Sequence, residues 1–324
     1  SKGLLRRFLL FTSFILSSLL AIPLTGRVDV VWAANPNILS IIPATVFSFF
    51  KKCPVALNVD DLWPEDIYDL KLIRKNSFIS RVASLLARMA YNKAKLITPI
   101  SPGYVKVIVG GYGVNPEKVY VVRAGVDPKK FKSTSATRFG WENLFIVLYS
   151  GAFSVAYDFD QVLMAAKIVE KVDKKVRFVI QGGGELLHHI RFKVRELKLK
   201  NVEIIDRVFS REEVAKLLNA SDVLILPLKD FGRPYLGISS KLYEYQAAGK
   251  PIICCGEGQP AEYIKETNSG IVVKPGDYKA LAEAILHLKN NSDLAKKLGF
   301  NGSRYVKENV SIEKVGFWLK EVFR

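Results

Sequence analysis

Residues 221–255 read SDVLILPLKDFGRPYLGISSKLYEYQAAGKPIICC and decide the fold. The stretch begins with a continuous apolar run, residues 223–228, which is typical of a strand buried on both faces of a parallel sheet. A polar loop follows, and Ser239 and Ser240 then favour the start of a helix, which Gly249 ends. A second apolar run, residues 252–255, completes a strand–loop–helix–strand unit of βαβ size.

The helix of this unit points its N-terminus at the carboxyl edge of the sheet. The N–H groups of Ser240, Lys241 and Leu242, with the helix dipole, predict an anion site there. Lys241 adds a full positive charge, and Glu244, one turn further on, can accept hydrogen bonds from ribose hydroxyls. A well-capped structural helix with a surface lysine and glutamate is the alternative, and caps and charges alone leave both interpretations open.

The segment GISSKLYEYQAAGKPII, residues 237–253, resembles the donor-site helix of the family 4 retaining glycosyltransferases. The branch that builds cell-surface polysaccharides is the most similar. The resemblance covers about residues 4–324 and is strongest over 204–309. It implies the GT-B fold of the α/β class, in which two Rossmann-like domains face each other across a cleft. It also implies sugar transfer from a nucleotide diphosphate sugar, with retention at the anomeric carbon and without a metal or other cofactor.

The resemblance extends to individual residues. It implies a catalytic set in which Lys241 and the nearby N–H groups hold the phosphates, Glu244 binds ribose and Asp61 lies near the acceptor. The resemblance implies three further parts of the donor site. They are a Gly turn after one strand, a Gly-x-Gly-x-Glu-like turn after the next strand, and a segment that holds the nucleotide base. The donor-binding residues implied in this way are Gly151, Gly182, Gly183, Gly184, Glu185, Arg207, Val208, Ser239, Ser240, Lys241, Leu242 and Glu244.

The chain departs from the family pattern at several places. Leu236 stands where many members have a glutamate that contacts the donor sugar, and Asp60 replaces a histidine before Asp61. The turn at Gly151 lacks the usual arginine and lysine. Nothing before residue 28 supplies the family's first strand and Gly-rich loop. We therefore expect a first domain without these two elements, in a chain that is incomplete at its N-terminus.

The length of 324 residues favours two domains. We expect an N-terminal, acceptor-side Rossmann-like domain over 1–133 and a C-terminal domain that binds the nucleotide sugar over 134–308. The boundary is placed in a polar linker. A final helix, 309–324, is expected to cross back to the first domain, as is usual in the GT-B fold.

Residues 4–24, LLRRFLLFTSFILSSLLAIPL, are apolar after two arginines. The uninterrupted stretch, residues 8–22, is shorter than the roughly 20 residues that a membrane-spanning helix needs. A helix of the first domain, a signal anchor and a transmembrane span are the alternatives. We favour the first, with its apolar side against a membrane surface.

The charge is strongly basic and uneven. The net charge is +17, and residues 69–138 contain 14 Lys/Arg against 3 Asp/Glu. Such a face fits anionic lipid, a polyanionic substrate or nucleic acid, and a lysine-rich surface without a partner is the alternative. Because no zinc-finger, RNP-like or helix-turn-helix pattern accompanies it, nucleic acid is not expected. Cys53, Cys254 and Cys255 show no metal spacing and are typical of buried residues in a reducing compartment.

The expected partners are therefore a nucleotide sugar, a glycan or lipid-linked acceptor, and a membrane surface contacted through 4–24 and 69–138. A cytoplasmic, peripherally membrane-associated glycosyltransferase accounts for these features. Two alternatives are a non-catalytic donor-binding or partner subunit of a membrane-associated glycan assembly complex, and a membrane-anchored scaffold. The triplet Asp158-Phe159-Asp160 resembles a metal signature, but its place at a helix start favours capping.

Overall fold

The computed structural model describes residues 2–34, 38–69, 74–131 and 139–323. The chain divides into two compact units, Ser1–Arg123 and Ala124–Arg324. The division comes before the boundary expected at about residue 133, which lies outside the described residues. Val126 and Phe131 explain the difference, because both are buried in the hydrophobic core of the second unit. Residues 70–73 and 132–138 of the basic window are also outside the described residues.

The second unit is built on six parallel strands in the order β6-β5-β4-β7-β8-β9. Counted from β4 along the chain, this is the order 3-2-1-4-5-6 of doubly wound nucleotide-binding folds. The strand order reverses between β4 and β7, and ligands of such folds bind at the carboxyl ends of the strands at that point. The strands are β4 (Phe145–Ala152), β5 (Val176–Gly183), β6 (Val202–Ile205), β7 (Val223–Pro227), β8 (Ile252–Cys255) and β9 (Gly270–Val273).

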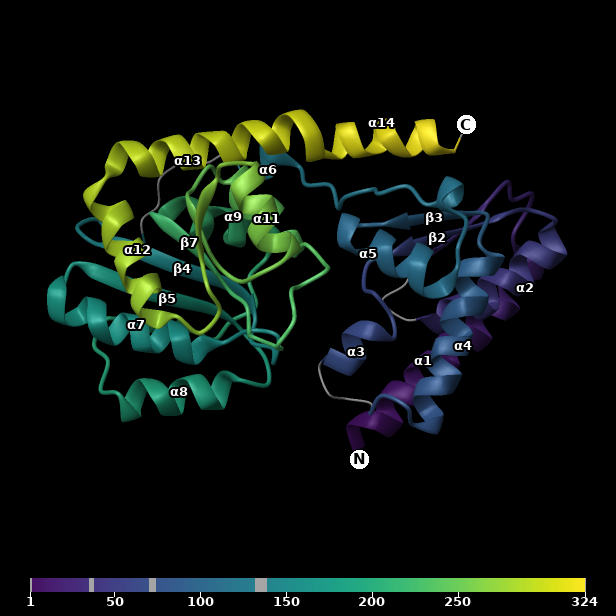
Figure 1. The fold of residues 1–324 in the computed structure, drawn as a ribbon, viewed down its shortest axis with the longest axis horizontal. Helices are drawn as coiled ribbons and strands as arrows, with labels where there is room; N and C mark the ends of the chain where they lie inside the picture. The colour runs from purple at the N-terminus through teal and green to yellow at the C-terminus, as the bar shows by residue number, and fades with distance from the viewer. Residues whose placement is uncertain (1, 35–37, 70–73, 132–138, 324) are drawn as a thin grey trace. The chain divides into compact units, whose positions relative to one another are not determined.

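Helices cover both faces of this sheet (Figure 1). Helices α7, α8 and α12 pack on one face and helices α9, α10 and α11 on the other. The helices of the unit are α6 (Pro128–Phe131), α7 (Phe159–Val172), α8 (Leu187–Glu196), α9 (Arg211–Ala220), α10 (Ser240–Ala247), α11 (Gln259–Glu266), α12 (Tyr278–Asn290), α13 (Ser292–Tyr305) and α14 (Ile312–Val322), with a π-helical turn at Val306–Val310.

Strand residues alternate between two hydrophobic clusters. In β4, Ile146 and Leu148 belong to one cluster and Val147 and Tyr149 to the other. A strand that is apolar at every position is therefore buried on both faces, as the runs in the sequence predict. Cys254 and Cys255 follow the same rule. Both are free and buried, and they enter opposite clusters.

The first unit contains three parallel strands in the order β1-β2-β3. Among the described residues no strand precedes β1. Residues 119–122 extend this sheet loosely, because the N–H groups of Tyr120 and Val122 donate to the carbonyls of Ile97 and Pro99. The elements are α1 (Lys2–Leu20), η1 (Ile22–Leu24), β1 (Val31–Ala34), η2 (Ile38–Ser40), α2 (Ile41–Lys51), β2 (Val55–Val59), α3 (Glu65–Asp69), α4 (Phe78–Lys93), β3 (Leu96–Pro99), α5 (Pro102–Lys106), η3 (Val107–Gly111) and η4 (Pro116–Lys118).

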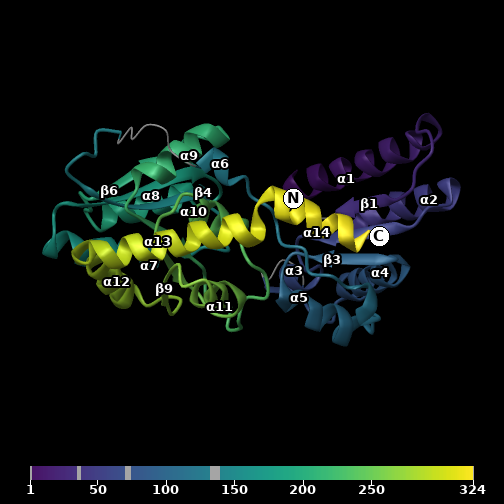
Figure 2. The same ribbon diagram turned by 90° about the horizontal axis from the view of Figure 1, so that it is seen from above.

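The apolar segment 4–24 forms α1 and η1. Helix α1 packs on α2, which in turn packs on β1 (Figure 2). Several of its large side chains, among them Leu10, Phe14 and Leu20, remain exposed. None of the described helices combines the length and the apolar content that crossing a bilayer requires.

Candidate functional site

Helix α10 begins where the strand order reverses. Ser239 is its N-cap residue with extended backbone, and its hydroxyl makes no capping bond. The first N–H groups of a helix have no acceptor within it, so the N–H groups of Ser240 and Lys241 are directed outward. Ser240 is exposed and Lys241 is half-buried. A positive helix end thus lies at the edge of the sheet where such folds bind ligands.

The Lys241 side chain lies over the end of β4. A Cβ atom added to Gly151 would overlap Cε of Lys241 and lie 2.7 Å from its Nζ. Gly151 also has a φ of 143°, which side chains rarely adopt. On its other side, Nζ of Lys241 lies 5.3 Å from the centre of the Tyr157 ring, a cation–π contact. A glycine at position 151 is therefore what allows the lysine to reach the strand end.

Gly182 brings the end of β5 against the same place. Gly151 and Gly182 are paired in the parallel register of β4 and β5. A Cβ atom on Gly182 would overlap the Gly151 carbonyl oxygen. Gly184 is equally confined, since its Cβ atom would lie 2.7 Å from the Phe153 carbonyl oxygen. The structure thus brings Lys241, Gly151 and the glycine turn 182–184 together, as the sequence predicts.

A chain of hydrogen bonds beneath these residues fixes α10 to the strands. The Tyr245 hydroxyl donates to the Ser150 carbonyl and accepts from the Ser150 N–H, both at 3.2 Å. Ser150 Oγ donates to Gln181 Oε1 at 2.6 Å, and Gln181 Nε2 donates to the Arg207 carbonyl at 2.6 Å. Tyr245 follows Lys241 by one helical turn on the same face, so this bond also sets the position of Lys241. Sequence reasoning missed Tyr245, although its spacing from Lys241 was a usable signal.

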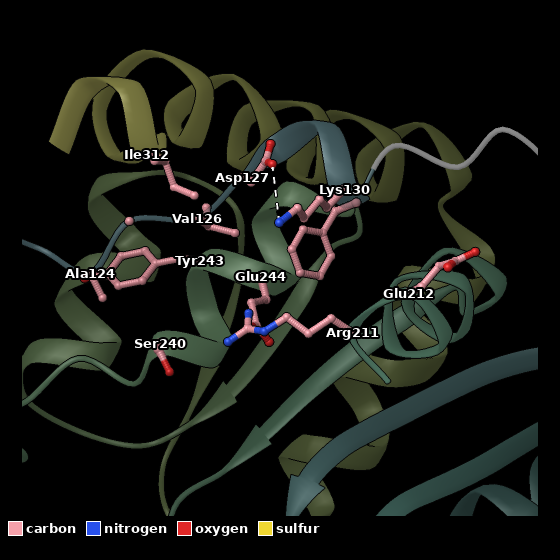
Figure 3. A pocket seen from close by; sticks show the side chains of 12 residues that line it. Ala124, Val126, Asp127, Lys130, Arg211, Glu212, Ser240, Tyr243, Glu244 and Ile312 are labelled. Atoms are coloured by element: carbon pink, nitrogen blue, oxygen red, sulfur yellow. Dashed lines mark hydrogen bonds and ion pairs between the residues drawn. The ribbon is translucent and has the colours of Figure 1, made fainter. Parts of the chain in front are cut away.

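Glu244 lies three residues after Lys241 on α10. It lies on the wall of a cavity of about 710 Å³, next to Ser240, in which charged side chains from α6 and α9 also lie. Arg211 lies across Glu244, and its Nη1 is 3.1 Å from Glu244 Oε1 (Figure 3). Arg211 is 81% exposed and Glu244 27%. Glu244 therefore has a cation as its partner, and sequence reasoning did not foresee this pair.

The structure corrects the role that the sequence predicted for Leu242. Its N–H was expected to bind phosphate, but it donates to the Ser239 carbonyl at 3.0 Å, and the side chain is fully buried. The first turn of α10 closes on its own cap residue, which removes this donor. Leu242 anchors the helix in the core and offers no N–H to a ligand. The candidate anion site is thereby reduced to Ser240, Lys241 and the helix end.

The remaining predicted donor residues have structural partners. Glu185 Oε1 accepts from the Val155 N–H at 3.2 Å and so joins the loops after β4 and β5. Arg207 pairs with Glu213, and its guanidinium lies 4.7 Å from the Phe209 ring centre. Val208 is 87% exposed at the end of the segment that follows β6. Gly183 lies near Asp206 at the same edge of the sheet.

Asp61 belongs to the first unit, in the loop after β2. The loop is held by Asn58, which donates to Asp60 Oδ1 at 2.8 Å and accepts from Thr98 at 3.1 Å. Asp61 is exposed at the surface, but protein around its carboxyl displaces part of the water, and this, together with the negative charge of Asp60, raises the pKa of Asp61. A carboxyl with a raised pKa in a loop at a strand end is a candidate for proton chemistry.

The Asp-x-Asp triplet caps a helix. Asp158 is the N-cap residue of α7 and its side chain accepts from the Gln161 N–H. Asp160 contacts His189 of α8, with 2.7 Å between Oδ1 and Nε2. Over the part of the chain that the structure describes, no group of three or more His, Cys, Asp or Glu side chains is arranged to hold a metal ion. The capping role of Asp158 is confirmed by its bond to the Gln161 N–H.

The site as a whole can bind an anion beside a polyol. Lys241 and the helix end supply positive charge at the strand ends, and Glu244 supplies a carboxylate acceptor. Residues three apart on a helix lie about 5–6 Å apart at their Cβ atoms. One ligand that carries a phosphate group next to a sugar ring can therefore reach both side chains.

Comparisons with known proteins agree with this chemistry. Residues 133–305 match the family model described as Glycosyl transferases group 1. An uncharacterized glycosyltransferase of Methanocaldococcus jannaschii is 28% identical over 176 residues, 54% of this chain and 47% of that protein. An amylovoran biosynthesis glycosyltransferase of Erwinia amylovora is 24% identical over 195 residues, 60% of this chain and 47% of that protein. The chain thus spans about half the length of these two curated relatives.

Solved structures share the fold. The crystal structure of Anabaena HepE in complex with UDP matches with a TM-score of 0.76 and 17% identity, over 97% of this chain and 81% of that chain. Sucrose-phosphate synthase of Thermosynechococcus elongatus matches with a TM-score of 0.74 and 16% identity, over 91% and 73% of the two chains. At these identities the likeness concerns the fold, and it confirms the GT-B class expected from the sequence.

Proposed function

Since the chain belongs to the group 1 glycosyltransferase family, we propose that it transfers a sugar from a nucleotide diphosphate sugar to a glycan or lipid-linked acceptor. The observation that carries the proposal is the position of Lys241, at the N-terminal end of α10 and directly over Gly151. The strand order reverses at this place, so a diphosphate there meets a lysine and a helix end together.

The proposed chemistry follows from charge. As the bond to the sugar breaks, negative charge grows on the leaving diphosphate, and Lys241 with the α10 dipole stabilises it without a metal ion. Glu244 exchanges its Arg211 partner for the ribose hydroxyls. We assign Asp61 to the acceptor side. The transfer is of the retaining, hexosyl type, and the acceptor proton leaves through the donor phosphate, so that no side-chain base is needed.

The nature of the donor is supported by a structural neighbour. HepE of Anabaena has been crystallised with UDP-glucose, and it shares the fold over 97% of this chain. We therefore propose that the donor of this chain belongs to the class of nucleotide diphosphate sugars. Its site offers an exposed Val208 beside the Arg207 and Phe209 pair for the base.

We also propose a cytoplasmic enzyme that works at a membrane surface in polysaccharide biosynthesis. The exposed apolar side chains of α1 and the described part of the basic window 69–138 support this place of action. A lipid-linked acceptor would be presented at the same surface.

The Lys241→Ala variant tests the proposal. Removing a charge that acts on the leaving group typically lowers kcat by about 10²–10³-fold. The assay measures release of the nucleoside diphosphate from a panel of nucleotide sugars with glycan and lipid-linked acceptors. Lys241→Arg keeps the charge and is expected to retain part of the activity, and Lys216→Ala on α9 is the matched surface control.

Three outcomes separate the alternatives. Turnover by the wild type that Lys241→Ala abolishes supports a transferase. Tight donor binding with no turnover for any acceptor identifies a non-catalytic donor-binding subunit. Full donor affinity and full turnover in Lys241→Ala would contradict the assigned role of this residue.

A further inference from the structure

Helix α4 presents its large apolar side chains to solvent and its small ones to the protein. Phe78 is 81% exposed and Leu85 58%. The buried positions hold mostly alanine. The exposed large side chains are Phe78, Ile79, Val82, Leu85 and Met89, and the buried residues of the helix are Ser80, Ala83, Ala87, Ala90 and Tyr91. A helix that only served the core would have the opposite arrangement.

The exposed side chains form one continuous stripe. Phe78, Val82, Leu85 and Met89 follow each other at intervals of four, three and four residues, which places them on one face of the helix. Single exposed apolar residues are normal on a protein surface. A contiguous apolar stripe on a helix of 16 residues marks an interaction surface.

The sequence around this stripe is rich in positive charge, while acidic side chains near α4 come from α3, which packs on it through Tyr68. Residues 70–116 contain eight Lys/Arg and no Asp/Glu. On α4 itself Arg81 and Arg88 are exposed, each three positions after a stripe residue, so they lie beside the stripe. Arg74 and Lys75 are exposed just before the helix and Lys93 at its end.

The apolar stripe and the positive charge beside it distinguish between the possible binding partners of α4. An amphipathic helix with apolar side chains on one face and arginine and lysine beside them matches the interface of an anionic bilayer. A second copy of the chain would bring two cationic helices together, which like-charge repulsion opposes. A neutral apolar partner would account for the stripe and leave the arginines and lysines beside it without a reason.

We propose that α4 docks the chain on an anionic lipid surface. Phe78, Val82, Leu85 and Met89 enter the acyl boundary, while Arg81 and Arg88 pair with lipid phosphates. The inference deepens the proposed function, because it names the surface that brings a lipid-linked acceptor and the enzyme together. It is tested by lipid binding alone, so failure of the proposed sugar transfer would leave it intact.

The experiment is vesicle co-sedimentation of the full chain. Vesicles of phosphatidylcholine with about one third phosphatidylglycerol are compared with vesicles of phosphatidylcholine alone, at low and high salt. The wild type is expected to bind the anionic vesicles, to release from them at high salt because the charges are screened, and to bind the neutral vesicles weakly.

Two double variants separate the apolar and the charged contributions. Leu85→Gln with Met89→Gln is expected to lower affinity by about tenfold or more, because both side chains are replaced in the acyl boundary. Arg81→Gln with Arg88→Gln is expected to lower affinity for anionic vesicles by about fivefold for each arginine. Phe192→Gln on α8, which is 62% exposed, removes a similar apolar area outside the stripe and is the matched control.

A tryptophan at the stripe reports insertion directly. Leu85→Trp is expected to show a blue-shifted emission with anionic vesicles, and Phe192→Trp is expected to show none. Wild-type affinity in both double variants, or equal losses in Phe192→Gln, would overturn the proposal. A wild-type dimer that the Leu85→Gln and Met89→Gln changes dissociate, measured by light scattering without lipid, would also overturn it and identify a second copy as the occupant.

Discussion

Asp61 illustrates how one residue departs from its ordinary chemistry. Its carboxyl is partly desolvated and lies near Asp60, and both effects raise its pKa above the ordinary value of 3.8. Ionisation of this group is therefore less favourable in the folded chain than in the unfolded chain.

The raised pKa gives a prediction for stability against pH. Between 3.8 and the higher folded value, the folded state binds more protons than the unfolded state, so stability falls as pH rises through this interval. The Asp61→Asn variant has no ionisable group at this position, so it does not lose stability as the pH rises through this interval. We expect its urea midpoint to exceed that of the wild type at neutral pH and to approach it at low pH. Asp29→Asn, in the same unit and highly exposed, serves as the control. A midpoint difference for Asp61→Asn that grows as pH falls would have the wrong sign.

Glu244 and Leu242 mark what the sequence of α10 could not reveal. The helix, its N-cap and the proximity of Lys241 to Gly151 were predictable, because caps are local and the carboxyl ends of parallel strands meet at one edge. The Arg211–Glu244 pair depends on how α9 lies beside α10, which local pattern does not encode. The bond from the Leu242 N–H to Ser239 depends on how tightly the first turn closes.

At the scale of elements, the sequence predicted the bounds of strands more accurately than it predicted which face of a helix is buried. The run at 252–255 coincides with β8, because a strand buried on both faces is apolar throughout. The apolar residues of α4 recur at helical spacing, but this spacing does not show which face is buried. Alanines on one face and large apolar residues on the other give similar periodicity, and only packing decides between them.

The start of α7 carries a prediction that separates capping from metal binding. Asp158→Ala removes the acceptor for the Gln161 N–H and is expected to lower the free energy of unfolding by about 1 kcal/mol. Asp158→Asn keeps an acceptor and is expected to stay near the wild type. Urea denaturation measures both changes. Loss of transferase activity in Asp158→Asn that added Mn²⁺ reverses would favour a metal role instead.

At the scale of the whole molecule, the second unit has its own core. Both hydrophobic clusters of the six-stranded sheet lie within residues 124–324. The division into two domains was predictable from length, but its position was not, because Val126 and Phe131 follow a segment that packs with β3. Only the packing of these two side chains assigns 124–131 to the second unit.

This independence predicts that residues 124–324 fold alone. Expressed without the first unit, they are expected to unfold cooperatively and to gain thermal stability with a nucleoside diphosphate, because ligand binding to the folded state raises Tm. Calorimetry with and without the ligand measures both properties. The Lys241→Ala form of the same fragment is the control and is expected to gain much less. A fragment that shows no cooperative transition would contradict the prediction.

The close approach of Lys241 to Gly151 also constrains how the chain can evolve. Any side chain at 151 meets the tip of the lysine, and the backbone there has a φ that side chains rarely adopt. A substitution of the glycine is therefore expected to strain the turn and to push the positive charge away from the strand end at the same time. Positions 151 and 241 are expected to change together in descendant lineages.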